Sequence, residues 1–198
     1  MLFDHTSCLI LAAGNSERMG EPKALLKFDT GTTFIEKITN TYVQSGVEQI
    51  VIVVNRELSI LLKERAIHLP SRVILVLNDR PDLGRFYSLK TGVPKVSPEH
   101  TCFLQNIDNP FTSIKILEEL YIHRNEADVI VPKFQNRSGH PVLLSPVVLK
   151  EISSSAELEV KINDFLKRFL INKIETSDES ILANINSLAD YQNSGFIL

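Results

Sequence analysis

The amino-acid sequence predicts an α/β protein with one domain over residues 1–198, built on a Rossmann-like, mostly parallel and twisted sheet that helices cover on both faces. Two observations predict this class. Short apolar runs alternate with helical patterns as far as residue 125, an order typical of a parallel sheet packed between helices. Two strand-like runs then flank a turn within 128–146, which predicts an antiparallel excursion. No repeat, low-complexity tract or linker divides the chain.

Each predicted element has its own local signal. The first helix begins at a capping box of Thr33 and Glu36 and ends at Gly46. Thr112 is predicted to cap a helix over 113–125. The segment 7–13 is apolar without polar alternation, as expected for a strand buried on both faces. The other strands of this half are predicted at 48–55, 72–79 and 101–108. Further helices are predicted at 58–68, 86–93 and 160–169, and the antiparallel strands at 128–134 and 141–146.

Composition narrows the function classes. The formal net charge is −3, so the chain has no overall basic field and a nucleic-acid polymer is not an expected partner. The apolar runs are far shorter than the ~20 residues that span a bilayer, and the N-terminus lacks the pattern of a signal peptide. We therefore expect a cytoplasmic protein without membrane contact. Cys8 and Cys102 lie in strand-like runs, where buried thiols are expected.

The segment LAAGNSERMGEPKALL (11–26) follows the first strand and indicates a phosphate-binding loop. Gly14 permits a sharp turn and a close approach to the backbone, and successive amides of such a loop can surround an anion. Arg18 offers a planar fork and Lys23 a compact charge, both suited to phosphate oxygens. The spacing matches neither the P-loop nor the dinucleotide-binding motif. The alternative is a solvated loop with surface charges.

The same segment resembles the signature L-A-A-G-x-S-x-R-M-G-x-x-K-x-L-L of the molybdenum-cofactor nucleotidyltransferases, which have a GT-A-like fold. The resemblance implies that Arg18 holds the β- and γ-phosphates of a nucleoside triphosphate and that Lys23 holds the α-phosphate. The nucleotide-binding residues that it implies in this segment are Leu11, Ala12, Ala13, Gly14, Ser16 and Gly20.

Two further segments extend the resemblance to the metal and the base. Asp108-Asn109-Pro110 is similar to the D-x-P that ends a strand in this family, which implies a catalytic Asp108 that binds Mg²⁺; the alternative is an Asx-type turn. The stretch 84–92 matches G-x-x-x-S-L-x-x-G, which implies a wall that reads the nucleobase. The residues implied there are Asn78, Gly84 and Ser88; the alternative is a helix N-terminus capped through Asp82 and Ser88.

The C-terminal half resembles the family less closely. Gly139-His140-Pro141 resembles a turn that faces the acceptor substrate, although a histidine in a tight turn can also be purely structural. Asn184 and Asn186 stand in the closing motif D/N-I-D/N-T-P-x-D, which implies a second Mg²⁺ contact at Asn184 and an acceptor contact at Asn186. The proline of that motif is missing, and so is the G-D-x-G-x-R stretch that many cytidylyl-transferring members carry near 153–166.

The resemblance implies a Mg²⁺-dependent nucleotidyltransferase that moves a nucleoside monophosphate to a phosphorylated acceptor and releases pyrophosphate. The implied donor is CTP, because Ala13 places a methyl group where guanylyl-transferring members have glycine; the implied acceptor is molybdopterin. Asn184 is instead typical of guanylyl members. The alternatives are guanylyl transfer, transfer to a sugar phosphate, polyol phosphate or phospholactate-type acceptor, and a non-catalytic nucleotide-binding module. A monomer or weak homo-oligomer is expected.

Overall fold

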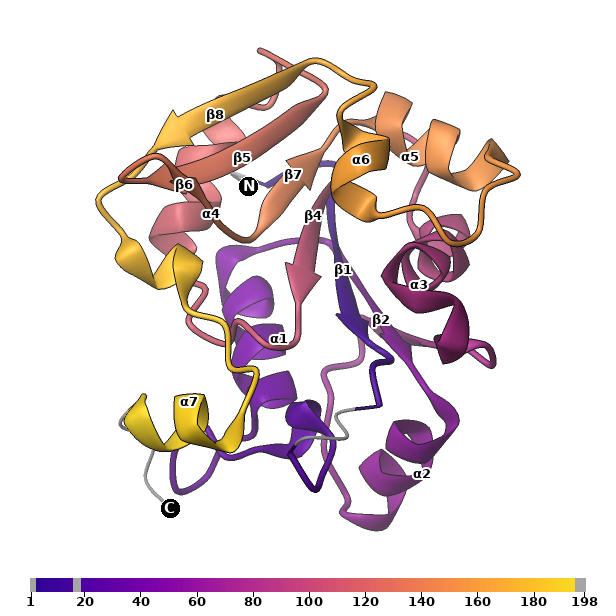
Figure 1. Cartoon of the computed structure of the whole chain (residues 1–198), viewed down its shortest axis with the longest axis vertical. Coiled ribbons are helices and arrows are strands. Elements are labelled where there is room, and N and C mark those ends of the chain that lie inside the picture. Colours follow the sequence, from indigo (N-terminus) through magenta and orange to yellow (C-terminus); the bar gives the residue numbers. More distant parts are fainter. Residues whose placement is uncertain (1–2, 16–18, 195–198) are drawn as a thin grey trace.

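A mixed sheet of eight strands forms the centre of the molecule in the computed structural model, which describes residues 3–15 and 19–194 (Figure 1). The strand order is β3-β2-β1-β4-β7-β5-β6, and β8 pairs with β5. Helices lie on both sides of this sheet, as α/β architecture requires. The predicted fold class is therefore confirmed.

The first four strands form the parallel half of the sheet. They are β1 (Thr6–Ala12), β2 (Gln49–Val54), β3 (Val73–Leu77) and β4 (Thr101–Asn106). β1 pairs in parallel with both β2 and β4, and all seven of its residues are buried. These are the four strands that the apolar runs predict. Because they are parallel, their carboxyl ends meet at one edge of the sheet, where ligands of such folds bind.

The other half of the sheet is antiparallel at its junction with β4. Its strands are β5 (Val129–Phe134), β6 (Arg137–Ser138), β7 (Val142–Leu144) and β8 (Ile171–Glu175). β7 lies antiparallel to both β4 and β5, and β8 runs parallel to β5. The predicted excursion is thus present. β8 was not predicted, because its two isoleucines are separated by Asn172 and Lys173 and give only weak strand patterning.

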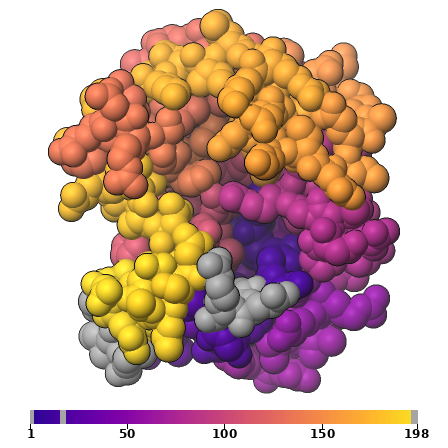
Figure 2. Space-filling model, in the orientation of Figure 1, coloured from indigo at the N-terminus to yellow at the C-terminus, as the bar shows by residue number. Residues whose placement is uncertain are grey.

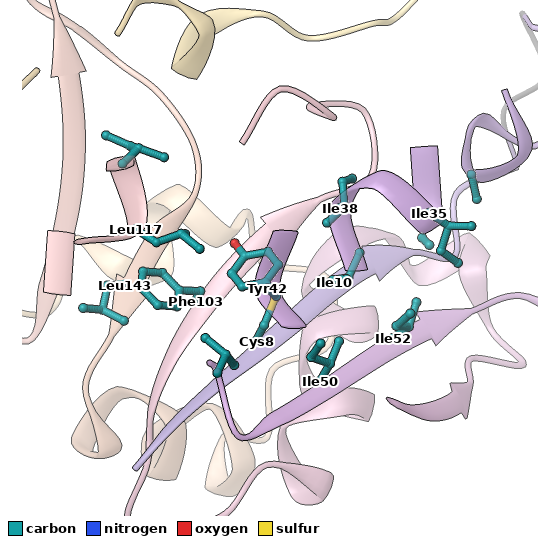
Figure 3. Close-up of a cluster of buried hydrophobic side chains, with 14 of the residues drawn as sticks. Cys8, Ile10, Ile35, Ile38, Tyr42, Ile50, Ile52, Phe103, Leu117 and Leu143 are labelled. Carbon is teal, nitrogen blue, oxygen red and sulfur yellow. The ribbon is translucent and has the colours of Figure 1, made fainter. Parts of the chain in front are cut away.

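One face of the sheet carries α1 (Phe34–Ser45), α2 (Arg56–Glu64) and α4 (Ile114–Ile122) over the larger apolar cluster. The capping box of Thr33 and Glu36 is formed, and Gly46 ends α1 in the left-handed conformation with φ 91°. Figure 3 shows Tyr42 of α1 beside Cys8 and Phe103, with its ring centroid 5.8 Å from that of Phe103. The prediction for Thr112 is wrong: the neighbouring Ser113 caps α4, while the Thr112 hydroxyl donates to Gln105 Oε1.

The opposite face carries α3 (Gly84–Gly92), α5 (Pro146–Ser154) and α6 (Ile162–Leu166) over a second apolar cluster. α3 lies so close to the sheet that a Cβ on Gly92 would be 2.6 Å from Val53 Cγ2, so a glycine is required there. α5 was not predicted, because Ser145 and Pro146, which are its N-cap and its first residue, were assigned to the end of the strand 141–146. Together the two clusters give the sheet the double-sided core expected of its apolar strands.

The remaining segments are short. Four 3-10 turns lie at Lys23–Leu25, Pro81–Leu83, Val93–Lys95 and Glu179–Leu182, and α7 (Leu188–Asn193) is the last helix described. Cys8 and Cys102 are free and buried, as expected, and burial raises the pKa of both thiols. Within residues 3–15 and 19–194, no helix has the length and apolar character needed to cross a bilayer.

Candidate active site

A cavity of about 470 Å³ opens at the carboxyl ends of β1 and β4. Figure 2 shows this face of the molecule hollowed between the yellow C-terminal segment and the magenta segment of α3, above indigo atoms of the N-terminal part. The described residues that line the cavity are Leu11, Gly14, Asn15, Met19, Lys23, Arg85, Ser88, Asn106, Ile107, Asp108 and Asn186. The cavity is therefore at the edge of the sheet where parallel strands place their ligands.

Lys23, Asp108 and Asn186 form the polar centre of the cavity. Lys23 stands at the start of a 3-10 turn after Pro22, and its Nζ lies 3.0 Å from Asn186 Oδ1 and 3.9 Å from Asp108 Oδ2. The Lys23 side chain is 14% exposed and that of Asp108 is 22% exposed, so water screens the two facing charges only in part. Three segments distant in the sequence thus meet at one ammonium group.

Backbone contacts fix the loop that carries Asp108. The Ile185 amide donates to the Asp108 carbonyl over 2.7 Å, which holds the segment of Asn186 against the end of β4. Below this contact, the Asn109 side-chain amide donates to the Ile181 carbonyl and the Gln105 amide donates to the Asn109 carbonyl. These bonds fix the backbone that carries the Asp108 carboxylate, which is part of the preorganisation that a charged site needs.

Asp108 also fits a metal ion. Its Oδ1 atom is buried and has no hydrogen-bond partner among the described residues. A buried carboxylate oxygen without a donor is costly unless a cation or a ligand satisfies it. Mg²⁺ takes carboxylate oxygens together with phosphates and water, so the chemistry of this orphaned atom suits it.

A second chain of contacts runs from Arg85 through Asn106 to His140. The Arg85 guanidinium donates to Asn106 Oδ1, which fixes the amide so that Asn106 Nδ2 faces His140 Nε2 over 2.8 Å. His140 must therefore accept at Nε2 and carry its proton on Nδ1. Burial, and then the nearby Arg85 charge, lower the pKa of His140 to about 4, whereas Asp108 acts in the opposite direction. The imidazole is neutral at physiological pH.

His140 acts through Asn106 rather than in the cavity itself. Asn106 lines the cavity and His140 does not. Gly139 is also outside the lining: a Cβ there would lie 2.7 Å from Ile181 Cγ1, so this glycine permits close packing against the 3-10 turn at Glu179–Leu182. The acceptor roles that the resemblance implies for Gly139 and His140 stay predictions, and the structure adds a positioning role to each.

The segment of α3 contributes a fixed hydroxyl to the cavity. Asn78 is fully buried and its side-chain amide donates to Ser88 Oγ over 2.9 Å, while its Oδ1 accepts from the Arg80 amide. Ser88 lines the cavity and Asn78 supports it from behind. Gly84 stands where the 3-10 turn meets α3 with φ 82°, a conformation that favours glycine. Neither Asp82 nor Ser88 caps α3.

The opening loop is described in part. Leu11 and Gly14 line the cavity, and the space beside Gly14 is open for 4 Å, so a ligand can approach its backbone. Ala12 and Ala13 are buried; Ala13 packs in the apolar cluster under α3 and does not line the cavity. Gly20 adopts φ 75°. Ser16 and Arg18 lie outside the described residues.

The closing motif places Asn186, rather than Asn184, beside Lys23 and Asp108. The Asn184 side-chain amide donates to the Leu182 carbonyl, and Asn184 does not line the cavity. The sequence reasoning did not include Arg85 or Asn106, both of which line it. A signal for Asn106 exists in the sequence: Gln105 and Asn106 are consecutive polar residues in an otherwise apolar strand. Arg85 follows the predicted Gly84 directly.

Comparisons with known proteins agree with this geometry. Residues 8–174 match the family described as "MobA-like NTP transferase domain". The molybdenum cofactor cytidylyltransferase of Escherichia coli is 32% identical over 144 residues, 73% of this chain and 72% of that protein. A probable molybdenum cofactor guanylyltransferase of Natranaerobius thermophilus is 28% identical over 197 residues, which cover 96% of this chain and 90% of that protein. The solved structure of a nucleotidyl transferase from Methanothermobacter superposes with a TM-score of 0.77 at 22% identity, covering 96% of both chains.

Proposed function

The chain belongs to the MobA-like NTP transferase domain family and is a nucleotidyltransferase, and from this premise we propose that it transfers CMP from CTP to a phosphate oxygen of a molybdopterin-type acceptor. The observation that carries the proposal is the meeting of Lys23, Asp108 and Asn186 in the cavity at the carboxyl ends of β1 and β4. A cation and a carboxylate held at fixed positions there suit a polyphosphate with a bound divalent metal.

In the proposed reaction, an acceptor phosphate oxygen attacks the α-phosphorus of the triphosphate in line with the leaving group. One phosphorus–oxygen bond forms to the acceptor, the bond between the α-phosphorus and the bridging oxygen breaks, and pyrophosphate leaves with the electron pair. Such a transfer needs positioning and charge neutralisation more than covalent help from the protein. Lys23 Nζ exchanges its contact with Asn186 for an α-phosphate oxygen and neutralises the charge that develops there.

Asp108 would hold Mg²⁺ through its orphaned Oδ1 atom. The bound ion would supply charge neutralisation to the phosphates and complete its coordination with water. Ser88, fixed by Asn78, and the open backbone at Gly14 would line the path of the nucleotide, and Arg85 would add a second cation to the rim of the cavity.

The choice of CTP is supported by the LAAG sequence of the opening loop and by the 32% identity to a cytidylyltransferase. Because Ala13 packs in the core, a preference for CTP would come from the path of the backbone at 12–14 and not from direct contact of its methyl group with the base. The guanylyl reaction is the second candidate, favoured by Asn184 in the closing motif and by the guanylyltransferase relative.

A direct test measures pyrophosphate release with each of the four triphosphates, Mg²⁺ and molybdopterin. We expect release with CTP that depends on both the acceptor and the metal. Competitive binding of the four triphosphates ranks the donors independently of the acceptor. If GTP wins in both measurements, the guanylyl candidate replaces the cytidylyl one; if no triphosphate yields pyrophosphate with molybdopterin, the acceptor in this proposal is wrong.

A further inference from the structure

Three side chains with metal-binding atoms meet at the amino ends of the parallel strands, the edge opposite the candidate active site. His5 precedes β1, Glu48 precedes β2 and His100 precedes β4. Each offers one nitrogen or oxygen atom, and these atoms all lie within 4.8 Å of one another. Among the residues that the structure describes, this is the sole group of three or more such side chains.

Hydrogen bonds fix the orientation of the His100 ring. The Gln49 side chain accepts at Oε1 from the Ser97 amide over 3.1 Å and donates from Nε2 to the Lys95 carbonyl over 2.9 Å, which defines its two ends. The Ser7 hydroxyl donates to this same Oε1 over 3.2 Å. With its proton used there, Ser7 Oγ must accept from His100 Nδ1, which lies 2.8 Å away.

The neutral His100 ring therefore directs a bare Nε2 lone pair toward Glu48. Its Nε2 atom lies 3.4 Å from Glu48 Oε2, so the lone pairs of the imidazole nitrogen and of the carboxylate oxygen are directed at the same space. An imidazole nitrogen with a free lone pair and a carboxylate oxygen beside it are ligand atoms that a divalent transition metal takes in proteins.

The other two side chains are placed to complete a site. Glu48 Oε1 accepts from the His5 amide over 2.9 Å, so the second oxygen of this carboxylate remains directed at His100. The His5 ring lies with its centroid 5.8 Å from that of His100. His5 and Glu48 are exposed, so their side chains can adjust while His100 stays fixed.

We propose that His5, Glu48 and His100 bind a divalent transition metal of the zinc class. Two ligands that are ~2.0–2.1 Å from a tetrahedral centre lie roughly 3.3–3.4 Å apart, which the Nε2–Oε2 distance of 3.4 Å already satisfies. The exposed His5 ring closes the remaining gap by a side-chain rotation. The Ser7–Gln49 chain behind His100 supplies the outer hydrogen bond that ligating histidines characteristically make.

Such a site would join three segments where β1, β2 and β4 begin. A metal that binds the folded chain and not the unfolded one stabilises it in proportion to its concentration above the dissociation constant. The bound metal would therefore stabilise the folded chain, and this role is independent of the proposed transfer reaction.

The test is a Zn²⁺ titration of the metal-stripped full chain by equilibrium dialysis with elemental analysis. The variants are His5→Ala and Glu48→Gln, two exposed positions that leave the buried His100 intact. His123→Ala is the matched control, because His123 Nδ1 lies 2.8 Å from Glu126 Oε1 in an exposed pair that belongs to no such group of three. Repeating each titration in an Asp108→Asn background removes any Zn²⁺ bound in the cavity.

We expect one Zn²⁺ per chain in the wild type and in His123→Ala, and at least a ~10-fold loss of affinity in each of the two site variants. Zn²⁺ should raise the melting temperature of the wild type and the control but not of His5→Ala. Equal affinity in all four proteins, or no stoichiometric binding by the wild type, would overturn the proposal and leave a proton-dependent His100–Glu48 ion pair in its place.

Discussion

Lys23→Ala removes the cation at the centre of the candidate active site. The Lys23 ammonium lies 3.9 Å from Asp108 Oδ2, and a transferred phosphate in the cavity would meet it at a similar distance. At an effective dielectric constant of about 20, a pair of unit charges at this separation interacts by ~4 kcal/mol. Only the part that grows as the transition state forms lowers the barrier, so we expect a loss of about 2.7 kcal/mol, or ~10²-fold in kcat.

The fold should survive this substitution. Lys23 is partly exposed in a short turn, and its backbone contacts do not depend on the side chain. We expect a change in unfolding free energy below ~1 kcal/mol, which for a chain of this length shifts the melting temperature by ~2–4 °C at most. Lys115→Ala is the matched control, since Lys115 is 69% exposed and pairs with Glu119 on α4.

The assay is single-turnover release of pyrophosphate from a saturating triphosphate, which separates the chemical step from binding. Lys23→Arg keeps the charge but changes its shape, and should retain more activity than the alanine variant. If Lys23→Ala turns over at the rate of Lys115→Ala, Lys23 does not contact the transferred phosphate and the reasoning from the cavity fails.

Three further predictions concern the surroundings of this lysine. Asp108→Asn should abolish Mg²⁺-dependent activity, because it removes the negative charge of the carboxylate whose Oδ1 atom has no hydrogen-bond partner among the described residues. Asp82→Asn is the control, since Asp82 is exposed. Identical Mg²⁺ titration curves for the two variants would contradict this prediction. His140 has a pKa of about 4 when folded and 6.5 in its ordinary state, so its contribution to stability is complete above pH 6.5 and is lost as the pH falls toward 4. Between pH 6.5 and pH 4, the unfolding free energy measured in urea should fall by on the order of 3 kcal/mol more in the wild type than in His140→Gln. Parallel plots of unfolding free energy against pH for the two proteins would refute the assignment. Gly139→Ala should cost ~1–3 kcal/mol of unfolding free energy, because its Cβ would collide with Ile181. Gly31→Ala is the control and should cost little, because its Cβ would make only an ordinary contact with Asp29 Oδ1 at 3.9 Å. Equal urea midpoints for the two variants would count against the packing argument.

The parallel half of the fold follows directly from the sequence. Continuous apolar runs predict all four parallel strands. β1, β2 and β4 are buried as such runs lead one to expect. β3 differs, because it lies at the edge of the sheet and leaves Ile74, Leu75 and Leu77 exposed. α5 and β8 were not predicted, for different reasons. The start of α5 has a local signal, Ser145 followed by Pro146, but these two residues were assigned to the preceding strand. β8 is held by its pairing with β5, and that long-range contact leaves little trace in the local sequence.

Part of the site could be predicted from the sequence and part could not. The residue types near the ends of predicted strands point to Gly14, Lys23 and Asp108, and the structure brings all three to one cavity. The chain from Arg85 through Asn106 to His140 could not be predicted, since it exists only when β7 returns antiparallel to β4. That Asn186 and not Asn184 lies beside Lys23 could not be predicted either. It depends on the long-range backbone contact of Ile185 with Asp108, which decides which asparagine faces the cavity.

The reversal of strand direction at β4 divides the cavity between two stretches of the chain. The four parallel strands come first, and β5 to β8 build the other half from a later, contiguous stretch. Gly14, Lys23 and Ser88 line the cavity from the first stretch, whereas Asp108 and Asn186 follow β4. A chimera joined after residue 106 would therefore keep the lysine and take its two polar partners from the other parent.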